Sequence, residues 1–221
     1  DWEAAGRSFL RYVETHRKAK DRSQAGFLAA VALLRGGRNE EALARFDALA
    51  ASYPLLADYH RVYGARAALA LGRSEAVLSR LEPLPAASVL DGEARLLRAE
   101  ALRRLERHGE AEQAFRGYLE AYPTSWREPE ARLRLAGEIE AQGPARWAEA
   151  RGQYLELHTR FPTDSFGRLA AERLLAVEPA ALSLAGPGRI ARGLALFRQN
   201  RNADAEAELR QALAAGGLDP E

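Results

Sequence analysis

Residues 42–54 read ALARFDALAASYP, and stretches with the same spacing return at 111–123 (AEQAFRGYLEAYP) and 150–162 (ARGQYLELHTRFP). Each stretch begins with Ala, carries an aromatic residue four positions later and ends with Pro. The residues between are mostly Ala, Leu, Arg and Glu, which are strong helix formers. Because Pro cannot continue a helix interior, the pattern predicts a helix that ends at the Pro and recurs along the chain.

Two weaker copies extend the series, one anchored at Val77 with Leu81 and one at Ala205 with Leu209. Successive anchors are separated by 35, 34, 39 and 55 residues. A small anchor residue lets a second helix cross closely, and the larger residue one turn later fills the groove to the next repeat. We therefore expect the anchors to be buried, together with five aromatic residues. These are Phe46, Phe115, Trp147, Tyr154 and Phe197.

Turn-like segments precede the anchors, for example Gly36-Gly37-Arg38-Asn39 and Leu71-Gly72-Arg73. Helix, turn and helix, with this anchor pattern at intervals of 34–35 residues, resembles the tetratricopeptide repeat family over residues 23–160. The resemblance implies an all-α fold, a right-handed α-solenoid of antiparallel helix pairs with about eleven helices. The all-α class also follows from the residues themselves, because strand-like alternation is nearly missing.

The longest interval between anchors contains a stretch rich in Gly and Pro. Residues 179–188 hold two residues of each type, and we expect them to form a loop or hinge. We therefore predict a solenoid over residues 1–178, opened by an extra helix within residues 1–20. A terminal helical hairpin is predicted over residues 189–216.

The composition excludes several classes of function. The 221 residues include 32 Lys and Arg against 31 Asp and Glu, and this balance argues against a dedicated binder of nucleic acid. The chain contains no Cys, so disulfides and cysteine-ligated metals are excluded. No apolar run approaches the ~20 residues that span a bilayer, so we expect no direct membrane insertion.

No residue pattern predicts catalysis. The four histidines lie in separate helical units without metal-binding spacing, and His108 is expected in an inter-helix turn. Three pairs of carboxylates are interpreted as solvated residues on outer helix faces, in ion pairs with neighbouring arginines. They are Glu40 and Glu41, Glu110 and Glu112, and Glu138 and Glu140. We therefore predict no catalytic residue, no metal site and no cofactor.

The resemblance to the repeat family implies a groove that binds a protein or peptide partner. In such repeats the first helices of successive pairs line an extended concave surface. The repeat register then gives a set of candidate groove residues on two first helices. They are Tyr59, Arg66, Glu93, Glu100, Arg103 and Arg104.

Two further resemblances concern the biological setting. The aromatic–Pro pairs at 122–123 and 161–162, each followed by Thr and then Ser, resemble repeats of bacterial cell-envelope proteins. They imply a non-catalytic scaffold in the periplasm or cell envelope, with the cytoplasm left open. Residues 189–210 are similar to the helical pair before the lysozyme-like domain of soluble lytic transglycosylases. The alternative is therefore the superhelical region of such a peptidoglycan-cleaving enzyme, with the catalytic domain outside this sequence.

Overall fold

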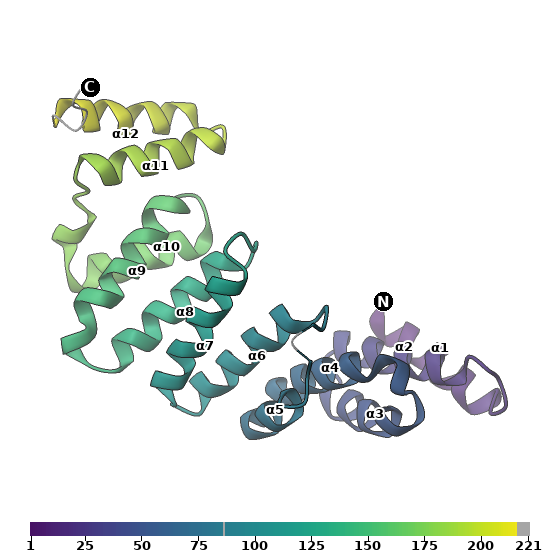
Figure 1. Ribbon diagram of the computed structural model, residues 1–221. Coiled ribbons are helices and arrows are strands. Elements are labelled where there is room, and N and C mark those ends of the chain that lie inside the picture. The colour runs from purple at the N-terminus through teal and green to yellow at the C-terminus, as the bar shows by residue number, and fades with distance from the viewer. Residues whose placement is uncertain (86, 216–221) are drawn as a thin grey trace. The chain divides into compact units, whose positions relative to one another are not determined.

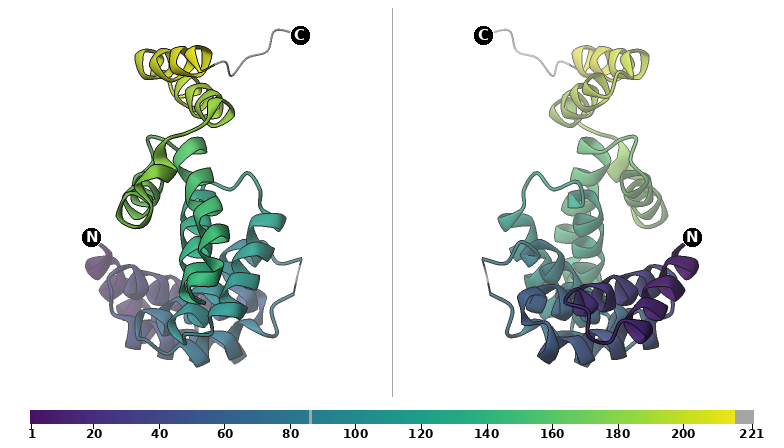
Figure 2. Two further views of the ribbon diagram at one scale, coloured as in Figure 1. Left: turned by 90° about the vertical axis from the view of Figure 1, so that its left-hand side faces the viewer. Right: turned by 90° about the vertical axis from the view of Figure 1, so that its right-hand side faces the viewer.

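The computed structural model describes residues 1–85 and 87–215, and the secondary structure in this part of the chain is entirely helical (Figures 1 and 2). These residues form twelve α-helices, one more than the number expected from the sequence. The chain divides into two compact units, Asp1–Ala114 and Phe115–Glu221, and the boundary lies within one helix. The predicted all-α class, built from helix pairs that pack on their sequence neighbours, is confirmed.

In the first unit each helix packs against the helix that follows it, from α1 through α6. Helices α4 and α6, which are the first helices of two consecutive pairs, also contact each other. The helices are α1 (Trp2–Thr15), α2 (Arg22–Arg35), α3 (Asn39–Ser52), α4 (Ala57–Ala70), α5 (Ser74–Leu81) and α6 (Asp91–Arg104). The next helix, α7 (His108–Ala121), crosses the boundary between the units. It begins at His108, so the prediction that this histidine lies in a turn was wrong.

In the second unit α9 packs on α8, α10 on α9, and α11 on both α9 and α12. The helices are α8 (Glu128–Ala141), α9 (Trp147–Arg160), α10 (Ser165–Val177), α11 (Gly186–Arg198) and α12 (Asn202–Ala214). Short 3-10 helices at Pro54–Leu56, Pro144–Arg146 and Pro179–Leu182 each begin with Pro.

The predicted hinge over residues 179–188 is largely helical, which corrects the expectation of a loop. Residues 179–182 form the third 3-10 helix, and α11 already begins at Gly186. Pro187 lies in the first turn of α11, where its missing N–H leaves no hydrogen bond unmade. The terminal hairpin thus starts three residues earlier than predicted, and its predicted end at residue 216 lies outside the described residues. The division of the chain at this linker stays a prediction.

The two helices of a pair are joined by the same turn in four places. One residue in each turn has a positive φ, namely Gly37 (77°), Gly72 (76°), Glu106 (57°) and Asn200 (59°). The Arg that follows donates its backbone N–H to a carbonyl in the last turn of the first helix, at 2.9–3.0 Å. This bond closes a left-handed helix terminus, a conformation that favours Gly and tolerates Asn. The four hairpins are therefore copies of one local structure.

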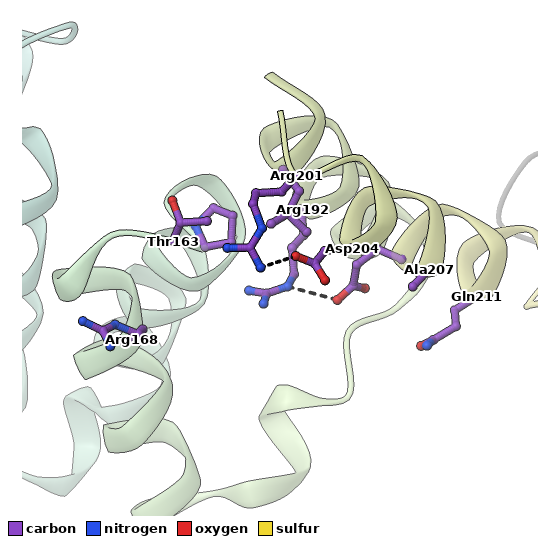
Figure 3. A pocket seen from close by; sticks show the side chains of 10 residues that line it. Thr163, Arg168, Arg192, Arg201, Asp204, Ala207 and Gln211 are labelled. Carbon is purple, nitrogen blue, oxygen red and sulfur yellow. Dashed lines mark hydrogen bonds and ion pairs between the residues drawn. The ribbon is translucent and has the colours of Figure 1, made fainter. Parts of the chain in front are cut away.

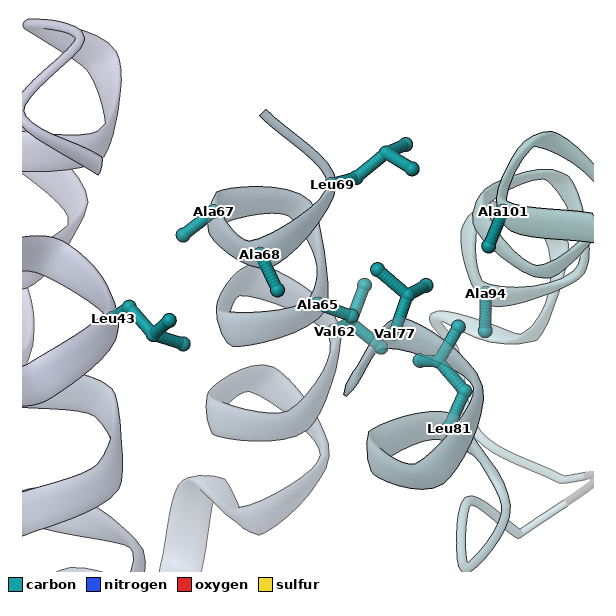
Figure 4. Close-up of a cluster of buried hydrophobic side chains, with 10 residues drawn as sticks. All are labelled: Leu43, Val62, Ala65, Ala67, Ala68, Leu69, Val77, Leu81, Ala94 and Ala101. Atoms are coloured by element: carbon teal, nitrogen blue, oxygen red, sulfur yellow. The ribbon is translucent and has the colours of Figure 1, made fainter. Parts of the chain in front are cut away.

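The anchor residues lie in the core, as the spacing predicts. Ala42, Val77, Ala111, Ala150 and Ala205 are at most 2% exposed. The aromatic residues Phe46, Phe115 and Tyr154 are at most 4% exposed, which confirms their assignment. In the first unit the core runs without a break through α3, α4, α5 and α6 (Figure 4).

Three expectations about buried and exposed residues were wrong. Phe197 is 61% exposed and so is not a core residue. Trp147 is only half-buried, and its indole N–H donates to Glu178 at 2.9 Å. Glu138 is buried within α8 and does not lie on a solvated outer face.

Ion pairs between neighbouring helix pairs join residues 33 positions apart, about one repeat. Arg73 pairs with Glu40, and Arg80 pairs with Asp47 at 2.6 Å, so that α5 is tied to α3 in both cases. In the second unit Arg116 pairs with Glu149, and Arg173 of α10 pairs with Glu140 of α8. The Arg173 guanidinium, hydrogen-bonded to Glu140, lowers the pKa of that carboxyl. The ties are exposed or half-buried, so each contributes roughly 0–1 kcal/mol.

Helix α11 is held against α9 by Arg192. Its Nη1 donates to the backbone carbonyl of His158 at 2.7 Å, in the last turn of α9. The same nitrogen lies 3.2 Å from the His158 ring, and Arg192 Nε donates to Glu208 at 3.0 Å. Burial lowers the pKa of His158 to about 4, with the Arg192 charge adding to the effect and Glu208 opposing it.

Replacement of the buried Phe46 by Ala is expected to lower the free energy of unfolding by about 3–5 kcal/mol, the usual cost for a Phe in a closed core. Urea titration monitored by circular dichroism measures the change. Trp126→Ala is the matched control, because this ring is 88% exposed and its removal should cost less than about 0.5 kcal/mol. Equal losses in the two variants would contradict the repeat register.

The stability of the second unit is expected to fall as the pH drops from 7 to 5. In the unfolded state the histidine has its ordinary pKa of 6.5, so it becomes protonated as the pH drops from 7 to 5. In the folded state the His158 ring stays neutral down to about pH 4. The unfolded state therefore binds more protons in this window, so the free energy of unfolding rises with pH. Melting temperatures at pH 5, 6 and 7 should show a smaller pH dependence in His158→Gln than in the wild type.

Two further histidine variants test whether His158 causes the pH dependence. Burial also lowers the pKa of His60 in the first unit, so the stability of that unit should depend on pH with the same sign. This dependence should remain in His158→Gln and be reduced in the double variant His60→Gln/His158→Gln. His16→Gln, the same substitution at an exposed position in the first unit, serves as the matched control variant. A pH dependence identical in His158→Gln and the wild type would contradict the assignment.

Candidate functional site

The six candidate residues lie on two helices that contact each other. Tyr59 and Arg66 come from α4, and the other four come from α6. Residues 59, 63 and 66 are spaced four and three apart on α4, so they share one helix face. The face of α6 that carries Glu93 and Glu100 is defined in the same way by a spacing of seven.

Charged side chains connect the two helices. Arg66 forms an ion pair with Glu93, and both side chains are only partly exposed, at 39% and 21%. Arg104 Nη1 donates to the carbonyl of Leu69 in the last turn of α4 at 2.7 Å. Glu100 accepts hydrogen bonds from Arg103 at 2.7 and 2.8 Å and from Arg104 at 3.1 Å. Five of the six candidates thus fall into two groups of interacting side chains, the Arg66–Glu93 ion pair and the cluster of Arg103 and Arg104 around Glu100.

The sixth candidate, Tyr59, belongs to an aromatic group that contacts Arg66 through Tyr63. Its ring lies 5.8 Å from that of Tyr63 and 6.2 Å from that of Phe27 on α2, both in edge-on geometry. Tyr63 stacks on Phe27 at 6.2 Å, and the Arg66 guanidinium lies 5.4 Å from the Tyr63 ring. Aromatic rings therefore lead from α2 across α4 to the Arg66–Glu93 pair, which joins α4 to α6.

We call this set the aromatic–charged strip. It consists of Phe27, Tyr59, Tyr63, Arg66, Glu93, Glu100, Arg103 and Arg104. The sequence interpretation missed Phe27 and Tyr63. Tyr63 carried a usable signal, since it stands between two candidates at helical spacing, whereas Phe27 carried none before the contact between α2 and α4 was known.

The chemistry of the strip suits recognition of another molecule through hydrogen bonds and apolar contact. Within the described part of the chain the hydroxyls of Tyr59 and Tyr63 have no hydrogen-bond partner, and both side chains are half-buried. Below the strip, His60 is 2% exposed and its Nε2 donates to the carbonyl of Tyr53 at 3.0 Å. Burial lowers the pKa of His60, and its ring packs edge-on against Phe27 of the strip, with the ring centroids 5.6 Å apart.

A cleft lies in the other unit, between the α9–α10 turn and the α11–α12 hairpin (Figure 3). It measures about 660 Å³. Its charges largely compensate one another, because Arg192 pairs with Glu208 at 3.0 Å and Arg201 pairs with Asp204 at 2.5 Å. Arg168, at the start of α10, is exposed and points away from these pairs. The cleft therefore offers no concentrated charge to a ligand.

Searches for other kinds of site give limited findings. Among residues 1–85 and 87–215, no group of three or more His, Asp or Glu side chains has the geometry to hold a metal ion. In the same residues no helix combines the length and apolar character needed to cross a bilayer. The histidines are dispersed, with His16 stacked on Tyr12 at 4.3 Å and His158 held against Arg192.

Comparison with known families matches two of the helical hairpins. The sequence model described as tetratricopeptide repeat matches residues 24–55 and 93–125. The matches cover α2–α3 and α6–α7, with the predicted anchors Ala42 and Ala111 in the second helix of each. The chain carries tetratricopeptide repeats. A search of curated proteins gives no significant match.

Tetratricopeptide repeats typically serve as scaffolds for protein interaction, and the two matches suggest this class of function. The aromatic–charged strip lies on the first helices of consecutive repeats. This is the side on which the resemblance to the family places a partner.

Proposed function

We propose that the aromatic–charged strip binds a segment of a partner protein, and that the chain is a scaffold in a bacterial envelope complex. The observation that carries the first part is the continuity from the Phe27–Tyr59–Tyr63 rings to the Arg66–Glu93 pair. Tyr and Arg are enriched where binding energy concentrates, because they combine apolar area with hydrogen-bonding groups. The segment recognised presents an apolar side chain to the rings and a polar group to Arg66 and the tyrosine hydroxyls.

The envelope location rests on different support. The aromatic–Pro pairs at 122–123 and 161–162, each followed by Thr and Ser, are similar to repeats of envelope proteins. Fractionation of the native organism, with antibody detection of this chain, tests the location independently of the binding proposal. Recovery in the cytoplasmic fraction alone would overturn it.

The binding proposal is tested with two charge reversals that are matched in design. Arg66→Glu places a carboxylate against Glu93, and Arg73→Glu places one against Glu40 on the second helices. Both break an ion pair between neighbouring repeats, so both should lower the melting temperature by a similar small amount. Only Arg66→Glu is expected to weaken binding of the partner. A loss of about 2 kcal/mol of binding free energy raises the Kd roughly thirtyfold.

The partner is first recovered on the immobilised wild-type chain and identified by mass spectrometry, and its affinity is then measured by calorimetry. Tyr63→Ala should reduce the affinity in the same way as Arg66→Glu, because it removes the ring that contacts both Phe27 and Arg66. A partner that binds Arg66→Glu and Tyr63→Ala as tightly as the wild type would exclude the strip.

A second candidate function is favoured by the sequence of the terminal hairpin. Residues 189–210 are similar to the helical pair before the catalytic domain of soluble lytic transglycosylases, so the chain is alternatively the superhelical region of such an enzyme. On this reading the described chain alone releases no soluble muropeptides from purified sacculi, whereas the complete gene product does. A complete product without a lysozyme-like domain would remove this candidate.

A further inference from the structure

The terminal hairpin α11–α12 repeats the structure of α2–α3 residue by residue, with numbers that differ by 163 throughout, as for Ala42 and Ala205. In both turns a residue with positive φ is followed by Arg, whose N–H donates to a Leu carbonyl at 2.9 and 3.0 Å. In both, that Arg pairs with an acidic residue three positions later at 2.5 Å. The equivalent residues are Leu33 and Leu196, Gly37 and Asn200, Arg38 and Arg201, and Glu41 and Asp204.

The equivalence identifies a face of α11 that is largely exposed, although the corresponding face of α2 is covered by neighbouring residues. Phe27, Val31 and Leu34 of α2 pack against a core cluster that is shared with Tyr63 of the next helix pair. Their counterparts on α11 are Ile190, Leu194 and Phe197. Leu194 is 43% exposed and Phe197 is 61% exposed, while Ile190 is half-buried. Within the described residues of the second unit, no helix packs over this stripe as α4 packs over its counterpart.

The neighbouring helix shows that another stacked repeat does not fit here. Leu43 on α3 is 6% exposed because the next repeat covers it. The equivalent residue on α12 is Glu206, which is exposed and pairs with Arg210 at 2.5 Å. A repeat stacked in the same way would bury this carboxylate, at a cost of several kcal/mol. The occupant therefore covers α11 and leaves the Glu206–Arg210 pair in water.

We propose that a second copy of this chain covers the stripe, with α11 packed antiparallel against α11 of the other copy. Residues 190, 194 and 197 have the spacing of a two-helix seam. An antiparallel pairing centred on Leu194 sets Phe197 of each copy over Ile190 of the other. Such a two-fold contact needs only one patch, because the patch is its own complement.

The proposal concerns the second unit and is independent of the partner-binding strip in the first, so each can fail without the other. The wild-type chain is expected to show a reversible monomer–dimer equilibrium in sedimentation velocity over a wide concentration range. Leu194→Glu should remain monomeric, since it places two carboxylates at the two-fold axis. Leu55→Glu, at an 80% exposed position in the first unit, should dimerise as the wild type does.

Because the chain contains no Cys, engineered disulfides report the geometry directly. Leu194→Cys should form an intermolecular disulfide on mild oxidation at a concentration where Leu55→Cys does not. A mixture of Ile190→Cys and Phe197→Cys should yield mainly the mixed disulfide, whereas parallel helices would favour the like pairs. This readout also stands if Leu194→Glu fails to fold.

Three results would overturn the proposal. One is a wild-type chain that stays monomeric at every concentration. Another is a dimer that Leu194→Glu leaves intact, because its contact would then lie elsewhere. The third is growth beyond the dimer into longer assemblies, since a two-fold contact closes on itself.

Discussion

The close crossing of paired helices is the constraint on which the rest of the structure depends. Ala30 and Ala42 are both fully buried in one cluster with Phe46, and the equivalent residues of α6–α7, Ala99 and Ala111, are fully buried as well. In the terminal hairpin the residue equivalent to Ala30 is Gly193, where an added Cβ would lie 2.8 Å from Leu209. Larger residues would separate the helix axes and open the groove that the anchor aromatic fills. The turns, the ion pairs between repeats and the aromatic–charged strip all depend on this short distance between the helix axes.

Much of the fold could be predicted from the sequence because its decisive contacts are local and periodic. The anchors and Phe46 are specified by a pattern that each helix pair carries within itself. The exposure of Phe197 could not be predicted in this way, because the burial of this position depends on a further helix pair. Such a pair follows α2–α3, whereas none follows α11–α12 within the described residues. The start of α11 was misjudged because Gly and Pro break helices in their interior, whereas Pro187 stands in a first turn, where it is tolerated.

The candidate site was predicted in part. Residues that share one helix could be grouped from the sequence, whereas contacts between helices could not. Residues on one helix face can be grouped by spacing alone, which gave Tyr59 with Arg66 and Glu93 with Glu100. The pairing of Arg66 with Glu93 joins residues of two repeats, and the sequence gives no sign of which acid an Arg will choose. The contact of Phe27 with Tyr59 and Tyr63 depends likewise on how α4 lies across α2. Propensity and periodicity describe a helix, but a surface shared by three helices is a property of their packing.

The ion pairs that link positions 33 residues apart have a consequence for how the chain forms and comes apart. Each such tie closes a loop only about one repeat long, so its entropic cost is small and stays the same along the chain. Structure can therefore nucleate in any hairpin and spread to its neighbours, as in a one-dimensional lattice. Under tension applied at its ends, a molecule built in this way extends in steps of one hairpin, and each released hairpin keeps the local turn from which it can reform.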